Sequence, residues 1–197
     1  MNIYLIRHGE IIQTFPRCFV GQTNLPLTAR GAAQMDAVGA YLADKDIGHV
    51  WCSPLERCAR GAERIAQPLG LAPEPISDLR EISLGAWEGL TVDQVRERFP
   101  GQYEARGQDL AHFCPAGGES FAQVQERAWT AFMHCVHEAS GNMAIVAHGG
   151  VNRTVLCRIL GVPIHALLRL EQDYGCVNHL RLANQEWRVA LMNFLPG

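Results

Sequence analysis

Short apolar runs bounded by turn residues alternate along the chain with longer stretches in which apolar residues recur at helical spacing. The apolar runs predict strands at residues 2–6, 48–52, 143–147, 176–182 and 187–192. Asn184 lies between the last two and favours a turn. Alternating strands and helices are typical of an α/β fold. We therefore expect residues 1–197 to form one three-layer αβα domain around a mostly parallel central sheet.

Local signals also predict where helices lie and begin. One predicted helix has apolar residues at helical spacing, namely Met35, Val38 and Leu42. Ser53 followed by Pro54 and Glu56 predicts a helix start with a serine N-cap. Thr91 and Gln94 predict a second start, with a capping box.

A long helix is predicted over residues 121–139. Its apolar face consists of Phe121, Val124, Ala128, Ala131, Cys135 and Ala139. Its opposite face is polar and is expected to be solvated: Gln123, Glu126, Arg127, Thr130, His134 and His137. Because His134 and His137 lack further ligands, we interpret them as surface residues rather than as a zinc site.

The charge balance argues against a nucleic-acid partner. The formal net charge is −3, from 17 basic and 20 acidic side chains, so any anion site must be local. The first residues lack the pattern of a signal peptide, and no apolar stretch reaches membrane-spanning length. The 7 cysteines form no C-x-x-C pair. We expect a cytoplasmic protein with mostly buried, reduced thiols and no membrane partner.

Two candidate groups follow the ends of predicted strands. His8 lies in the segment Arg7-His8-Gly9, directly after the first strand. Gly9 would allow the backbone to turn sharply and a ligand to approach. Arg57 lies in the first turn of the predicted helix that follows the second strand, where a positive charge does not suit the helix dipole. Each group taken alone could also be an ordinary loop or surface residue.

A third group has the same relation to the strand at residues 143–147. His148 is followed by Gly149 and Gly150, whose N–H groups would lie at a helix N-terminus that favours an anion. A glycine-rich connection with a hydrogen-bonded histidine is the alternative. Since open α/β sheets bind ligands at the C-terminal ends of their strands, one cleft could hold His8, Arg57 and His148.

Such a cleft would suit a phosphoryl group. Arginine can bind two phosphoryl oxygens as a fork, and a neutral imidazole offers a lone pair in line with a leaving oxygen. The motifs of P-loop nucleotidases, serine hydrolases with a nucleophile elbow, and zinc proteases are missing from the sequence. We expect a small-molecule phosphate ester as the substrate, with no metal and no cofactor.

Six ordered motifs extend this interpretation: LIRHGE at 5–10, GQTNLPLT at 21–28, SPLER at 53–57, LREI at 79–82 with glycines at 85 and 89, GGES at 117–120, and VAHGG at 146–150. In order and spacing the chain resembles the histidine phosphatase superfamily, which includes the cofactor-dependent phosphoglycerate mutases. The resemblance implies that His8 is phosphorylated and that Glu81 is the proton donor. It also implies phosphoryl binding by Arg7, Arg57 and His148.

The same resemblance implies that Gly21, Gln22 and Gly149 line the substrate side of the site. The chain departs from the family pattern after the nucleophile, where Ile11 and Thr14 replace residues that add phosphate contacts. It also has Asn24 where aspartate is common, which we expect to affect loop structure. Trp87 is expected in the core.

Several functions are compatible with these motifs. The short chain and the simple segment around Glu81 favour a phosphatase, and several segments are similar to α-ribazole phosphatases of cobalamin synthesis. A phosphoglycerate mutase and a broad-specificity phosphatase are the nearest alternatives. A phosphate-binding regulatory protein without turnover is an alternative of another class, but it would be expected to lack His8 or Glu81. The oligomeric state stays open, with a homodimer as one option.

Overall fold

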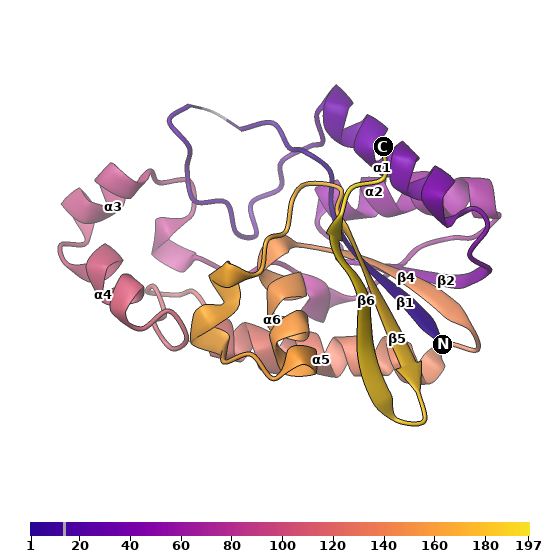
Figure 1. The fold of residues 1–197 in the computed structure, drawn as a ribbon. Coiled ribbons are helices and arrows are strands. Elements are labelled where there is room, and N and C mark those ends of the chain that lie inside the picture. Colours follow the sequence, from indigo (N-terminus) through magenta and orange to yellow (C-terminus); the bar gives the residue numbers. More distant parts are fainter. Residues whose placement is uncertain (14) are drawn as a thin grey trace.

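The computed structural model describes residues 1–13 and 15–197. Over these residues the strands form one sheet with the order β3-β2-β4-β1-β5-β6 (Figure 1). The strands are β1 (Asn2–Arg7), β2 (Ile47–Cys52), β3 (Glu74–Pro75), β4 (Asn142–Ala147), β5 (Val177–Ala183) and β6 (Glu186–Phe194). Strands β1 to β4 pair in parallel, whereas β5 and β6 are antiparallel to their neighbours. The expected mostly parallel sheet is confirmed.

Helices cover both faces of this sheet (Figure 1). The α-helices are α1 (Ala29–Leu42), α2 (Glu56–Ala66), α3 (Val92–Arg98), α4 (Gln102–Gln108), α5 (Phe121–Glu138) and α6 (Gly149–Leu160). The short 3₁₀ segments in the described part of the chain are η1 (Gln67–Leu69), η2 (Ser77–Leu79), η3 (Gly85–Trp87) and η4 (Ile164–Arg169). Helices α1 and α2 pack on one face, and α5 and α6 pack on the other, which confirms the three-layer arrangement.

The alternation of side chains along β1 explains why the sheet has helices on both faces. Ile3 and Leu5 are buried in the core cluster that contains α5 and α6. Tyr4 and Ile6 are buried in the other cluster, which contains α1 and α2. Successive side chains of a strand point to opposite faces, so an uninterrupted apolar strand needs cover on both.

Parallel pairing brings the ends of three strands to one edge of the sheet. The backbone N–H of His8, just after β1, donates to the carbonyl oxygen of Ala147 at the end of β4 over 3.0 Å. The N–H of Ser53, just after β2, donates to the carbonyl oxygen of Val146 over 2.9 Å. The segments that follow β1, β2 and β4 therefore leave the sheet side by side, as the strand-end argument predicts.

The predicted helix starts have different outcomes. The capping box of Thr91 and Gln94 is present at α3. The serine N-cap of α2 is wrong, because α2 begins at Glu56 and its N-cap residue Leu55 offers no side-chain acceptor. The N–H of Glu56 instead donates to Oδ1 of Asn24, over 3.1 Å, so Asn24 shapes its loop as expected.

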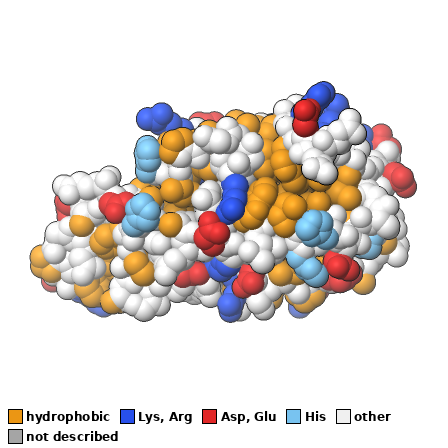
Figure 2. All heavy atoms as spheres, turned by 90° about the horizontal axis from the view of Figure 1, so that it is seen from below, with side chains coloured by type: hydrophobic (Ala, Val, Ile, Leu, Met, Phe, Trp, Pro, Cys, Tyr) orange, Lys and Arg blue, Asp and Glu red, His pale blue; other side chains and the backbone are white. Residues whose placement is uncertain are grey.

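The face of the molecule drawn in Figure 2 agrees with the expected charge balance. Basic and acidic side chains are interspersed on the underside of the molecule (Figure 2). None of the helices in the described part of the chain is long and apolar enough to cross a membrane. Burial of most thiols is confirmed, since five of the cysteines are buried: Cys52, Cys58, Cys135, Cys157 and Cys176.

Candidate active site

His8 directly follows β1 and is only 4% exposed. Its Nδ1 lies 2.7 Å from the carbonyl oxygen of Gly9. Because a carbonyl oxygen only accepts, Nδ1 carries the proton of the neutral imidazole and Nε2 carries the lone pair. The nitrogen of His8 that can act as a nucleophile is therefore Nε2.

The surroundings of His8 favour its neutral form. Burial, followed by the positive charges of Arg57 and Arg7, holds the pKa of His8 well below its ordinary value of 6.5. The hydrogen bond to Gly9 acts in the opposite direction and does not outweigh these effects. The lone pair on Nε2 is consequently available throughout the neutral pH range.

Gly9 is needed for the close packing of its loop against α1. A Cβ atom at Gly9 would lie 2.1 Å from the carbonyl oxygen of Gly31 in α1. A Cβ atom at Gly31 would in turn lie 2.0 Å from the carbonyl oxygen of Glu10. The missing Cβ atom of Gly9 thus allows a close contact between two backbone segments.

Arg7, the last residue of β1, has a buried donor without a partner. Its guanidinium carbon lies 3.9 Å from the centre of the Tyr174 ring, and its Nη1 donates to the carbonyl oxygen of Gln172. Its Nε is buried and has no hydrogen-bond partner among the residues that the structure describes. The Tyr174 ring centre is 5.5 Å from that of His8. This N–H is a candidate contact for a phosphoryl oxygen, since a buried, unpaired donor costs about 1–3 kcal/mol.

Arg57 lies in the first turn of α2 and is 1% exposed. Its Nη1 donates to the carbonyl oxygen of Thr23 over 2.8 Å, and its Nη2 donates to that of Gly21 over 2.7 Å. Its Nε donates to Nδ1 of His148 over 3.2 Å. A guanidinium has further N–H groups to offer a bound anion beyond those used in these contacts.

His148 is the N-cap residue of α6 and is fully buried. Because its Nδ1 accepts from Arg57, the proton lies on Nε2, which donates to Oγ of Ser53 over 2.8 Å. The ring centres of His148 and His8 are 5.2 Å apart. Burial, followed by the charge of Arg57, holds the pKa of His148 well below its ordinary value. The structure thus brings together His8, Arg57 and His148.

Glu81 lies in an irregular segment after η2, and its side chain reaches the N-terminus of α6. Its Oε1 accepts the N–H of Ile82, and its Oε2 accepts the N–H of Gly150, each over 3.0 Å. A Cβ atom at Gly150 would lie 2.3 Å from Oε1 of Glu81. The N-terminus of α6 therefore binds the carboxyl group of Glu81 in this structure, through Gly150, two residues after His148.

Gly21 and Gln22 lie in a loop whose backbone N–H groups bind one half-buried carboxylate, that of Glu88. The N–H groups of Gly21 and Gln22 and the hydroxyl of Thr23 all donate to Glu88, over 3.1, 2.8 and 2.7 Å. The Gln22 amide donates to the carbonyl oxygen of Glu81 over 3.0 Å. Burial raises the pKa of Glu88, but the hydrogen bonds from Thr23 and from backbone N–H groups outweigh it, so the net shift is downward.

Gly149 begins α6 and lies against two arginines. A Cβ atom there would lie 3.3 Å from Nε of Arg7 and 3.1 Å from Nη1 of Arg153. The Nε of Arg153 donates to the carbonyl oxygen of Leu170 over 2.7 Å. Burial, followed by the charge of Arg7, lowers the pKa of Arg153. The region therefore holds excess positive charge that an anion would offset.

Sequence reasoning missed Ser53, Tyr174 and Glu88, which contact predicted site residues. The hydroxyl of Ser53 accepts the N–H of Leu55 over 3.3 Å and also bonds His148. Ser53 therefore stabilises a turn and the His148 ring instead of capping a helix. Tyr174 lies in an irregular loop, where periodicity carries no information. Glu88 lies in one of the recognised motifs, but its partners are distant in sequence.

The departures from the family pattern also have structural outcomes. Ile11 is 6% exposed and forms an isolated antiparallel bridge with Leu27, so its position offers no side-chain oxygen for phosphate. Thr14 lies outside the described residues. Trp87 is fully buried between Phe19 and Phe113, each with its ring centre 5.3 Å away, which confirms its place in the core.

No group of three or more His, Cys, Asp or Glu side chains in the described ranges could hold a metal ion. His134 and His137 are exposed, as expected. A cavity of about 340 Å³ opens beside Tyr174 and is also lined by Glu10, Ile11, Ile12, Gln13, Phe15, Arg17 and Thr28. A larger cavity of about 900 Å³ includes residues of α1 and α2 but none of the predicted site residues. The smaller cavity is the better candidate because Tyr174 lies beside His8.

A sequence model of the histidine phosphatase superfamily (branch 1) matches residues 3–195. The chain belongs to the histidine phosphatase superfamily. The resemblance of the six motifs is confirmed by this match, and the superfamily fold agrees with the three-layer domain. With α-ribazole phosphatases among its relatives, this superfamily member is a phosphatase.

Two curated relatives and one solved structure show what this superfamily member is similar to. It is 30% identical to the "Probable phosphoglycerate mutase GpmB" of Salmonella choleraesuis, over 95% of this chain and 87% of that protein. It is also 30% identical to the adenosylcobalamin/α-ribazole phosphatase of Escherichia coli K12, over 89% of this chain and 87% of that protein. The crystal structure of the α-ribazole phosphatase from Shigella flexneri matches with a TM-score of 0.90 and 28% identity, over 98% and 96% of the two chains.

Proposed function

We propose that this chain is a phosphomonoesterase that transfers the phosphoryl group of a small ester to Nε2 of His8 and then to water. The orientation of the His8 ring carries this proposal. Its Nδ1–H is fixed on the Gly9 carbonyl, so the lone pair on Nε2 is the free nucleophile. The unpaired Nε–H of Arg7 supports the same site for the phosphoryl group.

In the first step, the lone pair on Nε2 of His8 attacks phosphorus. The N–P bond forms while the ester P–O bond breaks, and the leaving oxygen takes the bonding electron pair. Arg7 and Arg57 bind the non-bridging oxygens and balance their charge. His148 joins them by turning its N–H, which donates to Ser53 in this structure, toward a phosphoryl oxygen when the ester binds. Glu81, protonated when the ester binds, gives its proton to the leaving alkoxide.

The second step returns the enzyme to its starting state. Glu81, now ionised, takes a proton from water, and the water oxygen attacks phosphorus. The N–P bond breaks, its electron pair returns to Nε2 of His8, and inorganic phosphate leaves. The proton that Glu81 gave up in the first step is thereby restored.

The proposed substrate is an ester whose alcohol part fits the cavity of about 340 Å³ beside Tyr174. Ile12, Phe15 and Tyr174 give this cavity apolar and aromatic walls, and Arg17 adds a positive charge. Such a lining suits an aromatic nucleoside phosphate. We place α-ribazole 5′-phosphate first, because two of the similar proteins are α-ribazole phosphatases.

A panel of phosphate esters tests the proposed function. It should include α-ribazole 5′-phosphate, 3-phosphoglycerate and a simple alkyl phosphate, with release of inorganic phosphate as the readout. We expect phosphate release from at least one ester, the highest kcat/KM on the aromatic nucleoside phosphate, and no turnover by His8→Ala. Interconversion of phosphoglycerates without phosphate release would show a mutase and contradict the proposal.

A further inference from the structure

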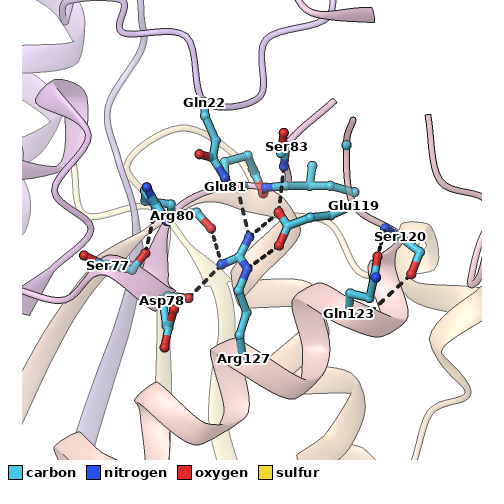
Figure 3. A network of polar contacts seen from close by, with 12 residues as sticks. Gln22, Ser77, Asp78, Arg80, Glu81, Ser83, Glu119, Ser120, Gln123 and Arg127 are labelled. Atoms are coloured by element: carbon cyan, nitrogen blue, oxygen red, sulfur yellow. Dashed lines mark hydrogen bonds and ion pairs between the residues drawn. The ribbon is translucent and has the colours of Figure 1, made fainter. Parts of the chain in front are cut away.

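Arg127 does not face solvent, although its position in α5 predicts that it should. Its side chain is 18% exposed and points from α5 toward the irregular segment that contains Glu81 (Figure 3). Its Nε and Nη2 donate to the two carboxylate oxygens of Glu119, over 2.7 and 2.8 Å. This is the two-pronged geometry in which an arginine binds a carboxylate most strongly.

The remaining N–H groups of Arg127 hold a backbone. Its Nη1 donates to the carbonyl oxygens of Asp78 and Arg80, each over 2.7 Å, and its Nη2 donates to that of Glu81 over 3.1 Å. Together with the two bonds to Glu119, these contacts use every N–H group that a guanidinium has. Arg127 is thus completely engaged in holding residues 78–81 (Figure 3).

Glu119 binds the same backbone segment on the C-terminal side of Glu81. Its Oε2 accepts the N–H of Ser83 over 2.8 Å, so the segment is held on both sides of residue 81. Burial raises the pKa of Glu119, but the hydrogen bonds from Arg127 and Ser83 outweigh it and leave that pKa below its ordinary value. Glu119 therefore stays ionised at neutral pH.

The segment needs such partners because it has no strand neighbours. Residues 80–84 are irregular, and backbone groups that are withdrawn from water must find partners outside regular structure. The Glu81 carbonyl oxygen accepts from both Arg127 and Gln22. The Glu81 carboxylate is in turn fixed by the N–H groups of Ile82 and Gly150.

We propose that Arg127 and Glu119 are positioning residues for proton transfer by Glu81. Arg127 touches only the backbone of residue 81, not its carboxylate, so its effect on the chemistry is indirect. It fixes where the Glu81 side chain begins, and thus where the carboxyl group lies relative to His148 and His8. This inference rests on the proposed function, in which Glu81 protonates the leaving group.

The test uses the different needs of two leaving groups. An alkoxide needs a proton to leave, whereas a nitrophenolate departs without one. The ratio kcat/KM reports only steps up to the first irreversible one, which here is phosphorylation of His8. Arg127→Met should therefore lower kcat/KM for an alkyl phosphate by about tenfold or more, and for nitrophenyl phosphate by less than about threefold.

A second comparison separates positioning from general loosening of the fold. In a Glu81→Gln background, Arg127→Met should cause little further loss on the alkyl phosphate, because the group that it positions is already gone. Glu119→Gln keeps the shape of the pair and provides a milder variant in case Arg127→Met does not fold. It should show the same selective loss, smaller in size.

Arg158→Met is the matched control. Arg158 pairs with Glu126 of α5 over 3.0 Å, but it is more exposed than Arg127 and does not contact residues 78–83. This variant should leave both substrates unaffected.

Equal losses on both substrates in the Arg127 and Glu119 variants, or no loss, would overturn the inference while Glu81→Gln remains selective. If Glu81→Gln itself shows no selectivity between the substrates, the proposed role of Glu81 fails as well.

Discussion

The Nε–H of Arg57 donates to Nδ1 of His148, and this contact places the proton of the neutral His148 ring on Nε2. His148 carries its proton on Nε2, facing Ser53, whereas His8 carries its proton on Nδ1, facing Gly9. The lone pair on Nε2 of His8, unlike that of His148, accepts no hydrogen bond from a donor among the residues that the structure describes. Arg57 thus occupies the lone pair of His148, which leaves Nε2 of His8 as the candidate nucleophile.

Arg57→Lys should be severely impaired. The single guanidinium of Arg57 contacts His148, Gly21 and Thr23, and in the proposed mechanism it also binds phosphate oxygens. A lysine cannot make all of these contacts at once. We expect kcat/KM to fall by about 100-fold or more, as for the loss of a group that stabilises transition-state charge. Steady-state kinetics on the preferred ester measure this loss.

The control for Arg57→Lys is Arg64→Lys in the same helix. Arg64 binds both carboxylate oxygens of Asp36, but on an exposed face. That substitution should change kcat/KM by less than about twofold, since exposed ion pairs contribute little. Similar effects of the two substitutions would remove Arg57 from the site.

Replacement of Glu81 should separate the two chemical steps. Glu81→Gln should lose almost all turnover of alkyl phosphates, yet react once with nitrophenyl phosphate and accumulate phosphoenzyme. Rapid-quench kinetics would show that single turnover as a burst. Because both oxygens of Glu81 accept backbone N–H groups, the glutamine amide must face one donor, so Glu81→Ala is needed as a second variant. Equal losses on both substrates without a burst would assign Glu81 to substrate or loop positioning only.

The buried histidines should make the fold sensitive to mild acid. The pKa values of His8 and His148 are both lowered in the folded state, so below about pH 6.5 the unfolded chain binds protons that the folded chain does not. The free energy of unfolding should therefore fall as pH decreases below that value, by about 1.4 kcal/mol per pH unit for each histidine that stays neutral.

Urea unfolding at several pH values measures this dependence, and His148→Asn isolates one contribution to it. Between about pH 6.5 and pH 5, the free energy of unfolding of the variant should fall less steeply with decreasing pH than that of the wild type. The slope should be smaller by up to the contribution of one histidine. Proton uptake on unfolding should fall by up to one proton in the same range. An unchanged slope would mean that His148 titrates normally in the folded protein.

Activity should not require a divalent cation. In the proposed mechanism, Arg7 and Arg57 balance the phosphoryl charge that a metal would otherwise stabilise. Turnover should therefore be unchanged, within about 20%, after dialysis against a chelator. Activity that disappears in chelator and returns with magnesium would assign the charge stabilisation to a metal instead.

The sheet could be predicted from sequence because its strands are short apolar runs, of which β1 and β4 are buried on both faces. The strands at β1, β2, β4, β5 and β6 were identified to within one or two residues, and Asn184 indeed adopts a positive φ of 51° in the hairpin turn. The strand β3 escaped notice because it has only two residues, Glu74–Pro75, which carry no periodic pattern.

The arrangement of the site could be predicted only where it follows from topology. Parallel strands place His8, Arg57 and His148 at one edge, so their proximity could be inferred from local patterns. Arg127 was assigned to the wrong environment because the period of one helix does not reveal which irregular segment packs against it. The role of Tyr174 depends in the same way on a distant contact.

The location of the phosphoryl group on the enzyme tests the central claim most directly. Wild-type protein should be mixed with a phosphate ester, quenched in alkali within milliseconds, and analysed by peptide mass spectrometry and ³¹P NMR. The proposed mechanism predicts one acid-labile, base-stable phosphoryl group on Nε2 of His8, and none in His8→Ala. A phosphoryl group on His148, or ordinary turnover by His8→Ala, would contradict it.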